Sequence, residues 1–287
     1  MLQEKIEVLK VKPGEEFFLD KTPSRIKRLY ADRDEYKKLL KKYKRNIDYL
    51  QLKFYASADH ALLVILQGMD TSGKDSMIRH VMSGVNPQGC GVFSFKKPSM
   101  EELQHDYLWR YQYKIPPSGM IGIFNRSYYE DIIVPAVHPD ILKYKSEDWF
   151  NQRCLQINEY EKYLTENKVV VMKFFLHLSK KEQKNRLVRR IESPASNWKF
   201  SMDDLMERKH WENYQQVYGQ CLNKTSTEYA PWYILPADDK KNARIMLSYI
   251  LCEKFCELNV KFPVPDKKHK ALLKQVDKEL KSKKFMA

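Results

Sequence analysis

The residues best suited to chemistry lie in a short loop that follows an apolar segment. Residues 61–66 read Ala-Leu-Leu-Val-Ile-Leu, and the loop after them runs from Gly68 to Lys74, with a second glycine at Gly73. This spacing is typical of a phosphate-binding loop, in which glycines allow a tight turn and backbone N–H groups face phosphate oxygens. Lys74 would add a point charge, and a helix that begins here would favour the same anion. The loop therefore predicts a phosphate site.

One position departs from the usual pattern of such loops. The residue after Lys74 is Asp75, where a Ser or Thr normally offers its hydroxyl to magnesium. Another group must then hold the metal. Asp70 is the candidate, because a carboxylate inside the loop would repel phosphate unless a cation bridged the two. The alternative is that these acids only complement the helix dipole, and for Asp75 we favour this alternative.

A second polar cluster follows the apolar segment 120–124. It begins with Asn125 and Arg126 and ends with Glu130 and Asp131. Ligands bind at the carboxyl ends of strands in an open parallel sheet, so we expect this cluster beside the phosphate loop. An amide, a fixed cation and two carboxylates suit phosphoryl transfer, because positioning and charge neutralisation supply most of its acceleration. The structural alternative is that Arg126 only pairs with Glu130, one helical turn further on.

A third cluster is basic and predicts a lid over about residues 182–212. A helix that carries Lys184, Arg186 and Arg190 runs into a loop that contains Trp198. Helical spacing places the two arginines on one face, one turn apart. From there they could close over phosphates and exclude water. The alternative is an ordinary solvated basic face.

The composition limits the partners and the compartment. The chain of 287 residues has 51 Lys and Arg against 37 Asp and Glu, a net charge of +14, which argues for nucleic acid, an anionic membrane or a phosphate-rich substrate. The five cysteines show no Cys-x-x-Cys spacing, so neither a disulfide framework nor a zinc site is indicated. No apolar signal core begins the chain, and no apolar run approaches the ~20 residues of a membrane span. We therefore predict a cytoplasmic protein.

The segments around these clusters predict an α/β fold. Strand candidates alternate with helical patterns and are too apolar to have a solvated face, which indicates a parallel sheet covered by helices on both sides. Ser99 and Glu102 predict a capping box at the start of one helix. The expected strands span residues 61–66, 91–95, 120–124, 169–176 and 232–235, and the expected helices cover 33–56, 99–114 and 147–167, with a further helix after the phosphate loop.

We predict one main domain with an extension at each end. Residues 1–56 comprise an arm, irregular over 1–32, and a long amphipathic helix that packs on the core. Residues 57–262 form the phosphate-loop domain. Residues 263–287 form a basic tail, which we expect to be a frayed amphipathic helix.

These clusters together closely resemble the polyphosphate kinase type 2 family, from about Asp34 to Cys256. The resemblance implies a phosphate-loop fold related to thymidylate kinase, a helical lid, dependence on magnesium, which manganese could replace, and phosphate transfer between inorganic polyphosphate and nucleotides. Many relatives have Asp-Arg where this chain has Asn125-Arg126. The run 125–131 instead looks like the third subclass, which accepts nucleoside monophosphates and diphosphates. The matching stretches are residues 66–75, 84–89, 94–96, 121–131, 197–201 and 235–238.

The motifs and the resemblance give three predicted sets of site residues. The catalytic set is Asp70, Lys74, Asn125, Arg126, Arg186 and Arg190. The predicted metal ligands are Asp70 and Glu130. The predicted phosphate and nucleotide contacts are Met69, Thr71, Ser72, Gly73, Asp75, Ser76, Lys96, Ser127, Glu130 and Asp131.

The expected activity is reversible, magnesium-dependent transfer of phosphate from inorganic polyphosphate to AMP, ADP or both, which regenerates ATP. We expect a homo-oligomer, either a dimer or a tetramer, and no nucleic-acid or membrane partner. The alternative is an ATP-dependent nucleotide or small-molecule kinase of the same fold, although such an enzyme has no special need for a charge of +14. A nucleic-acid-binding module would explain the charge but not Gly73-Lys74 after a buried strand.

Overall fold

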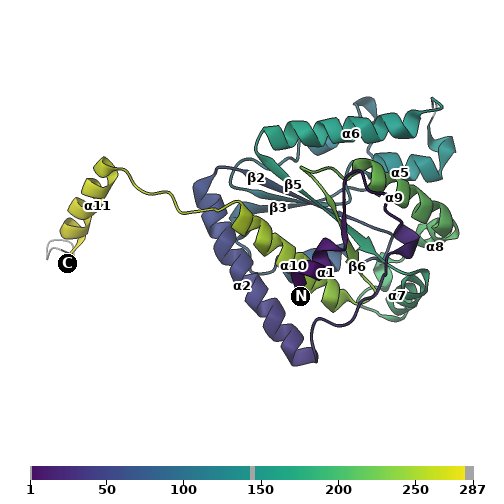
Figure 1. Ribbon diagram of the computed structural model, residues 1–287, viewed down its shortest axis with the longest axis horizontal. Coiled ribbons are helices and arrows are strands. Elements are labelled where there is room, and N and C mark those ends of the chain that lie inside the picture. The colour runs from purple at the N-terminus through teal and green to yellow at the C-terminus, as the bar shows by residue number, and fades with distance from the viewer. Residues whose placement is uncertain (1, 143–145, 282–287) are drawn as a thin grey trace.

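A sheet of six strands forms the centre of the computed structural model, which describes residues 2–142 and 146–281 (Figure 1). Within these residues the strand order is β1-β6-β5-β2-β4-β3. Neighbouring strands from β2 to β6 pair in parallel, and only β1 pairs antiparallel, with β6. The strands are Lys10–Val11 (β1), Ala61–Gln67 (β2), Cys90–Ser94 (β3), Ile121–Asn125 (β4), Val169–His177 (β5) and Trp232–Pro236 (β6).

Helices cover both faces of the sheet, as predicted (Figure 1). Side chains of β2 alternate between two apolar cores, Leu63 and Ile65 in one, Leu62 and Val64 in the other. One core includes residues of α5, α6 and α9, and the other includes residues of α2, α3 and α10. The helices are Leu2–Glu7 (α1), Arg33–Ser57 (α2), Lys74–Val81 (α3), Trp109–Gln112 (α4), Glu130–Val137 (α5), Trp149–Glu166 (α6), Lys180–Glu192 (α7), Met202–Lys209 (α8), Trp211–Thr225 (α9), Lys240–Glu257 (α10) and Lys267–Leu280 (α11).

The strand register brings two of the predicted clusters to one edge. Leu66 near the end of β2 lies opposite Asn125 at the end of β4. The Leu66 carbonyl also accepts a hydrogen bond of 3.1 Å from the Arg126 backbone N–H. The phosphate loop after β2 and the polar run after β4 therefore start side by side, although they are far apart in the chain.

The helix predicted over residues 99–114 is wrong. The capping box forms, since the Ser99 N–H donates to Glu102 Oε2 at 2.8 Å and the Glu102 N–H donates to Ser99 Oγ at 3.2 Å. It caps only a 3₁₀ turn, Glu102–Gln104, and α4 follows separately. Between them the Asp106 carboxylate accepts a hydrogen bond of 2.9 Å from the Leu108 N–H. This local turn competes with a continuous helix.

The arm over residues 1–32 is more regular than predicted. It contains α1, strand β1 and a 3₁₀ turn at Leu19–Lys21. Strand β1 adds to the sheet through pairing with Tyr233 and Trp232 of β6. The period-2 pattern of a two-residue strand is too short to be recognised in a sequence.

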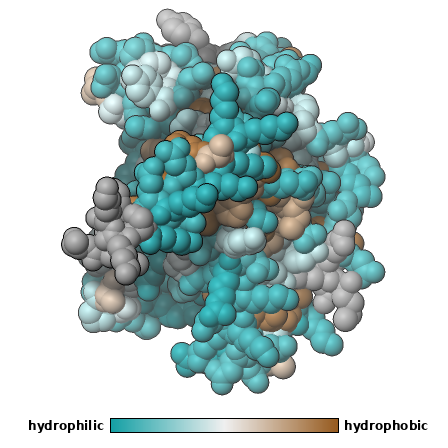
Figure 2. Space-filling view, turned by 90° about the vertical axis from the view of Figure 1, so that its left-hand side faces the viewer, coloured by the Kyte–Doolittle hydropathy of each residue, from teal (hydrophilic) through white to brown (hydrophobic). Residues whose placement is uncertain are grey.

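The predicted helix in the basic tail is confirmed as α11, which extends away from the rest of the molecule (Figure 1). Every described residue from 261 to 281 is exposed, and residues 282–287 of the predicted tail lie outside the described residues. Figure 2 views the molecule from the α11 side, where hydrophobic residues show among mostly hydrophilic ones. Over residues 2–142 and 146–281, none of the helices combines the length and apolar character needed to cross a membrane.

Candidate active site at the phosphate loop

The phosphate loop joins β2 to α3 and carries unusual backbone angles. Gly68 has φ 142°, and a Cβ at this position would lie 2.8 Å from the Leu176 carbonyl oxygen, so only glycine fits. Thr71 has φ 62°, which is costly for a β-branched residue. Such strain persists where the surrounding structure enforces it, and it concentrates at functional sites.

Two hydroxyl groups of the loop are buried without a hydrogen-bond partner. They are Thr71 Oγ1 and Ser72 Oγ. Nearly all buried polar groups in folded proteins have a partner, so each exception calls for an explanation. Oxygen donors inside a phosphate loop are suited to a metal ion or a phosphate group.

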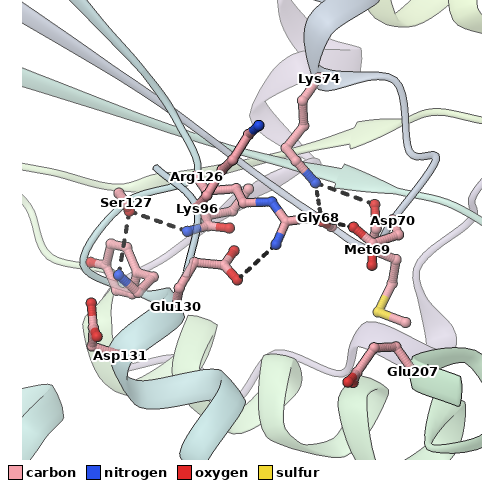
Figure 3. Close-up of polar contacts among 12 residues, drawn as sticks. Gly68, Met69, Asp70, Lys74, Lys96, Arg126, Ser127, Glu130, Asp131 and Glu207 are labelled. Carbon is pink, nitrogen blue, oxygen red and sulfur yellow. Dashed lines mark hydrogen bonds and ion pairs between the residues drawn. The ribbon is translucent and has the colours of Figure 1, made fainter. Parts of the chain in front are cut away.

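Lys74 begins α3 and lies within the loop. Its ammonium group donates hydrogen bonds to the carbonyl oxygens of Gly68 at 2.6 Å and Met69 at 3.4 Å (Figure 3). Burial lowers the pKa of Lys74 to about 8, and the positive charge of Arg126 contributes in the same direction. The lysine is therefore a poorly solvated cation that an anion would stabilise.

Arg126 lies between two carboxylates (Figure 3). Its guanidinium forms an ion pair with Asp70 of the phosphate loop and another, of 3.4 Å, with Glu130 of α5. Glu130 and Asp70 raise the pKa of Arg126 above its usual value, so the arginine stays charged. Burial raises the pKa of Glu130, and the charge of Arg126 opposes this. The structure thus brings the first two predicted clusters together, and the structural alternative, the pair of Arg126 and Glu130, also forms.

Asp131 does not lie beside Arg126 as Glu130 does. Its carboxylate accepts a hydrogen bond of 2.6 Å from the Tyr111 hydroxyl and pairs with Arg110 at 3.3 Å. Consecutive residues at the start of a helix point in different directions, so the acid pair that the sequence suggested is divided. Burial raises the pKa of Asp131, and the Tyr111 hydrogen bond opposes this.

Asn125 ends β4 and contacts the start of α3. Its side-chain amide donates to Asp75 Oδ1 at 2.7 Å and to Ser94 Oγ at 3.3 Å. Lys199 of the predicted lid lies 3.6 Å from the other Asp75 oxygen. Asp75 therefore connects the helix after the phosphate loop with β4 and the lid, which is more than the dipole role we favoured.

The two lid arginines point to different places. Arg186 in α7 donates to the carbonyl oxygens of Thr71 at 3.1 Å and Ser72 at 2.7 Å, and it also donates to the Ala237 carbonyl oxygen. Arg190 instead pairs with Asp204 of α8 at 2.6 Å. Arg186 therefore contacts the phosphate loop, while Arg190 connects α7 with α8.

The other residues predicted to contact phosphate or nucleotide occupy different positions around the phosphate loop. Ser127 is buried, and its hydroxyl forms a hydrogen bond of 3.2 Å with the buried side chain of Gln67 at the end of β2. Ser76 accepts a hydrogen bond of 2.6 Å from Arg244 of α10. The Lys96 carbonyl oxygen accepts from Arg110 at 2.8 Å. Met69 and Gly73 belong to the loop itself, and Gly73 has φ 107°.

Some residues near the site had no part in the sequence predictions. Arg244 and Lys240 lie in α10, and burial lowers the pKa of Lys240 to about 8, with Arg186 as the second cause. Glu207 in α8 accepts a hydrogen bond of 2.6 Å from the Tyr214 hydroxyl. Asp239, the N-cap of α10, was the available signal for this helix, because its side chain accepts from two backbone N–H groups.

The oxygen groups of the site fit a magnesium ion. Among the residues that the structure describes, no group of three or more His, Cys, Asp or Glu side chains is arranged to hold a metal ion. The carboxylates of Asp70 and Glu130 flank Arg126, and the unpartnered Thr71 hydroxyl lies in the same loop. Magnesium typically uses one or two carboxylates together with substrate phosphates and water. This set of donors is of that kind.

Comparison with known proteins agrees with the site and the fold. The family model described as Polyphosphate kinase 2 (PPK2) matches residues 30–263. The chain is 45% identical over 267 residues to the ADP-polyphosphate phosphotransferase of Rhodopseudomonas palustris, covering 90% of this chain and 92% of the relative. It is 42% identical over 222 residues to the AMP/ADP-polyphosphate phosphotransferase of Meiothermus ruber, covering 77% and 82%.

A solved structure has the same architecture. The crystal structure of Polyphosphate Kinase 2 from Arthrobacter aurescens TC1 superposes with a TM-score of 0.85 at 36% identity, over 94% of this chain and 96% of that one. The family resemblance and the phosphate-loop α/β fold predicted from the sequence are thereby confirmed. The chain belongs to the Polyphosphate kinase 2 family and is an enzyme that transfers phosphate.

Proposed function

We propose that the protein transfers the terminal phosphoryl group of inorganic polyphosphate to both AMP and ADP and so regenerates ATP. The observation that carries the proposal is the convergence of Lys74, Asp70, Arg126 and Glu130 at the carboxyl ends of β2 and β4. Relatives named for AMP or ADP and polyphosphate support the choice of substrates. A net charge of +14 suits a long polyanionic donor.

The chemistry follows from charge and position. Lys74 and the backbone N–H groups of the loop bind phosphate oxygens of the donor, at the positive end of α3. Arg126 exchanges a carboxylate partner for the transferring phosphoryl group and neutralises its spread charge. Magnesium or manganese, held by Asp70 and Glu130, supplies further neutralisation of the phosphate oxygens when bound. Arg186 stabilises the conformation of the phosphate loop through its hydrogen bonds to the Thr71 and Ser72 carbonyl oxygens.

The use of two acceptors rests on Glu130. With Asp131 turned toward Tyr111 and Arg110, one carboxylate of the pair remains beside Arg126. If Glu130 held a hydrated metal ion here, the site would adjust to acceptors with one or two phosphates more readily than a rigid arginine clamp would. Phosphoryl transfer between two phosphoanhydrides also runs in reverse on the same groups.

The test is to incubate the enzyme, magnesium and long-chain polyphosphate with AMP alone and to follow the nucleotides by chromatography. We expect ADP first and ATP later. ADP without ATP would contradict the use of two acceptors, and ATP from added ADP but none from AMP would indicate a diphosphate-specific enzyme. A parallel reaction with ATP as the donor tests the alternative of an ATP-dependent kinase, which would be favoured if ATP outperformed polyphosphate.

A cytoplasmic location and a homo-oligomeric state, as a dimer or tetramer, belong to the same proposal. All five cysteines are free thiols, which suits a reducing compartment. Light scattering coupled to size-exclusion chromatography measures the oligomeric state directly, and a monomeric mass would contradict this part of the proposal.

A further inference from the structure

A fully buried ion pair lies behind the loop that presents Arg126. Lys173, in the middle of β5, pairs with Glu161 of α6 at 2.6 Å, and both side chains have 0% exposure. Taking two charges out of water costs several kcal/mol per ion, and apolar replacements of such pairs are often neutral or stabilising. Stability alone therefore gives no sufficient reason for this pair.

The pair binds the hydroxyl groups of two consecutive tyrosines. Glu161 Oε1 accepts hydrogen bonds from Tyr128 at 2.9 Å and from Tyr129 at 2.8 Å. Lys173 donates to the Tyr129 hydroxyl at 3.0 Å and to the Thr225 carbonyl oxygen at 2.5 Å. Burial raises the pKa of both tyrosines well above the usual range, so they remain protonated donors. Groups from α6 and β5 therefore hold one dipeptide, and α9 in turn holds Lys173.

This dipeptide lies in the chain between Arg126 and Glu130, two of the charged residues of the candidate site. Arg126 precedes it, Glu130 follows it, and Arg126 has φ 65°. A left-handed conformation costs a residue with a side chain roughly 1–2 kcal/mol, so the neighbouring structure must enforce it. Backbone hydrogen bonds also restrain the segment, from the Arg126 N–H to the Leu66 carbonyl oxygen at 3.1 Å and from the Glu130 N–H to the Ser127 carbonyl oxygen at 2.9 Å, but neither of these bonds holds the side chains of residues 128 and 129.

We propose that Glu161 and Lys173 are positioning residues for phosphoryl transfer. Through the hydroxyls of Tyr128 and Tyr129 they hold residues 126–130 in the conformation that presents Arg126 to the transferring phosphate. The identity of the reaction rests on the proposed function, whereas the effect on the loop does not. Both side chains are fully buried, so they act on the reaction through the loop and not by contact with a substrate. A displacement of about 1 Å at a reacting centre can cost about 10²-fold in rate.

The test uses a double variant, Glu161→Leu with Lys173→Met, which removes both charges and leaves neither unpaired. We expect the melting temperature to fall moderately, because removing both charges leaves no ion unpaired but leaves the hydroxyls of Tyr128 and Tyr129 without their acceptor. We also expect kcat to fall by about 10²-fold while the KM for polyphosphate changes much less. Tyr129→Phe, which removes one hydroxyl, is a milder second variant and should lower kcat by about tenfold, the effect of about 1.4 kcal/mol in the barrier.

The matched control is Tyr160→Phe. Tyr160 lies on α6 next to Glu161, and its ring packs on that of Tyr128 at 5.7 Å between centroids. Its buried hydroxyl has no hydrogen-bond partner. Loss of this hydroxyl should leave kcat, KM and the melting temperature unchanged.

Amide hydrogen exchange of the peptide 125–133 supplies a readout that does not depend on activity. We expect exchange at least about tenfold faster in the double variant and in Tyr129→Phe than in Tyr160→Phe. Native kcat and native exchange in both variants would overturn the proposal, as would a loss of kcat that follows the melting temperature while exchange stays native. If the native enzyme transfers no phosphate from polyphosphate, the proposed function fails, and the exchange rates still decide whether the pair positions the loop.

Discussion

At the scale of single residues, Arg126 links the two halves of the site. It carries the charge that pairs with Asp70 of the phosphate loop and with Glu130 of α5. The sequence suggested that these groups converge, because each follows a buried strand of a parallel sheet. The separation of Asp131 from Glu130 was not predictable, because it depends on where Tyr111 and Arg110 lie in the folded chain.

Replacement of Asp70 tests the metal assignment. Asp70→Asn keeps the size of the side chain and removes its charge, so we expect a large loss of turnover and a weaker apparent affinity for magnesium. Magnesium titrations of the reaction rate measure both effects. Asp75→Asn is the matched control, with its magnesium dependence expected to stay close to native. An Asp70→Asn variant with native rate and native magnesium dependence would refute the assignment.

The lowered pKa of Lys74 predicts that kcat/KM for polyphosphate depends on pH. With a pKa lowered to about 8, the lysine is charged below pH 8 and loses its proton above it. Since phosphate binds the charged form, kcat/KM for polyphosphate should fall as the pH rises through about 8. Lys240 has a pKa of about 8 as well, so the profile of Lys240→Gln serves as the control. A profile that loses its inflection in that variant would assign the titration to Lys240 instead.

At the scale of elements, α7 holds two arginines with separate tasks. Arg186 is buried against carbonyl oxygens of the phosphate loop, and Arg190 pairs with Asp204 of α8. Their spacing of four residues predicted that Arg186 and Arg190 lie on one face of the helix. It did not predict which residues each arginine contacts. The arginines were expected to arrive together on closure, whereas Arg186 already contacts the loop.

Single alanine variants should separate these two roles. Arg186→Ala leaves several carbonyl groups without a donor, so we expect a loss of about 3 kcal/mol in the free energy of unfolding, measured with urea, together with lower activity. Arg190→Ala should change stability little, because a partly exposed pair contributes little, but it should lower kcat if the lid takes part in the reaction. Equal effects of the two variants on the free energy of unfolding would contradict the separate roles of Arg186 and Arg190.

The predicted elements show where sequence patterns succeed. Apolar runs identified the five parallel strands, and β2, β4, β5 and β6 are buried along most of their length. Strand β3 at the edge of the sheet is partly solvated, so the expectation that no strand has a solvated face is wrong for β3. The helix predicted over residues 99–114 is interrupted near Asp106 by a hydrogen bond from the Leu108 N–H to the Asp106 carboxylate. The spacing of apolar residues does not reveal such a local hydrogen bond. Helix α10 was overlooked because it is buried on several sides, between α2 and the sheet, and so lacks a clear polar face.

At the scale of the whole molecule, the basic tail stands apart from the domain. Every described residue of α11 is exposed, including Leu272, Leu273 and Val276. We therefore expect removal of residues 263–287 to change the melting temperature of the domain by no more than a few degrees, since little buried surface is lost. Scanning calorimetry checks this outcome, and a large fall in melting temperature would contradict the separation of the tail.

A single-turnover assay tests the mechanism most directly. It follows the transfer of ³²P from labelled long-chain polyphosphate to ADP, with the native enzyme and with Arg126→Ala. We predict labelled ATP from the native enzyme and a rate about 10²–10³-fold lower in the variant, because one charge-neutralising group has been removed from the site. Unlabelled ATP, or a native rate in Arg126→Ala, would contradict phosphoryl transfer from polyphosphate at this loop.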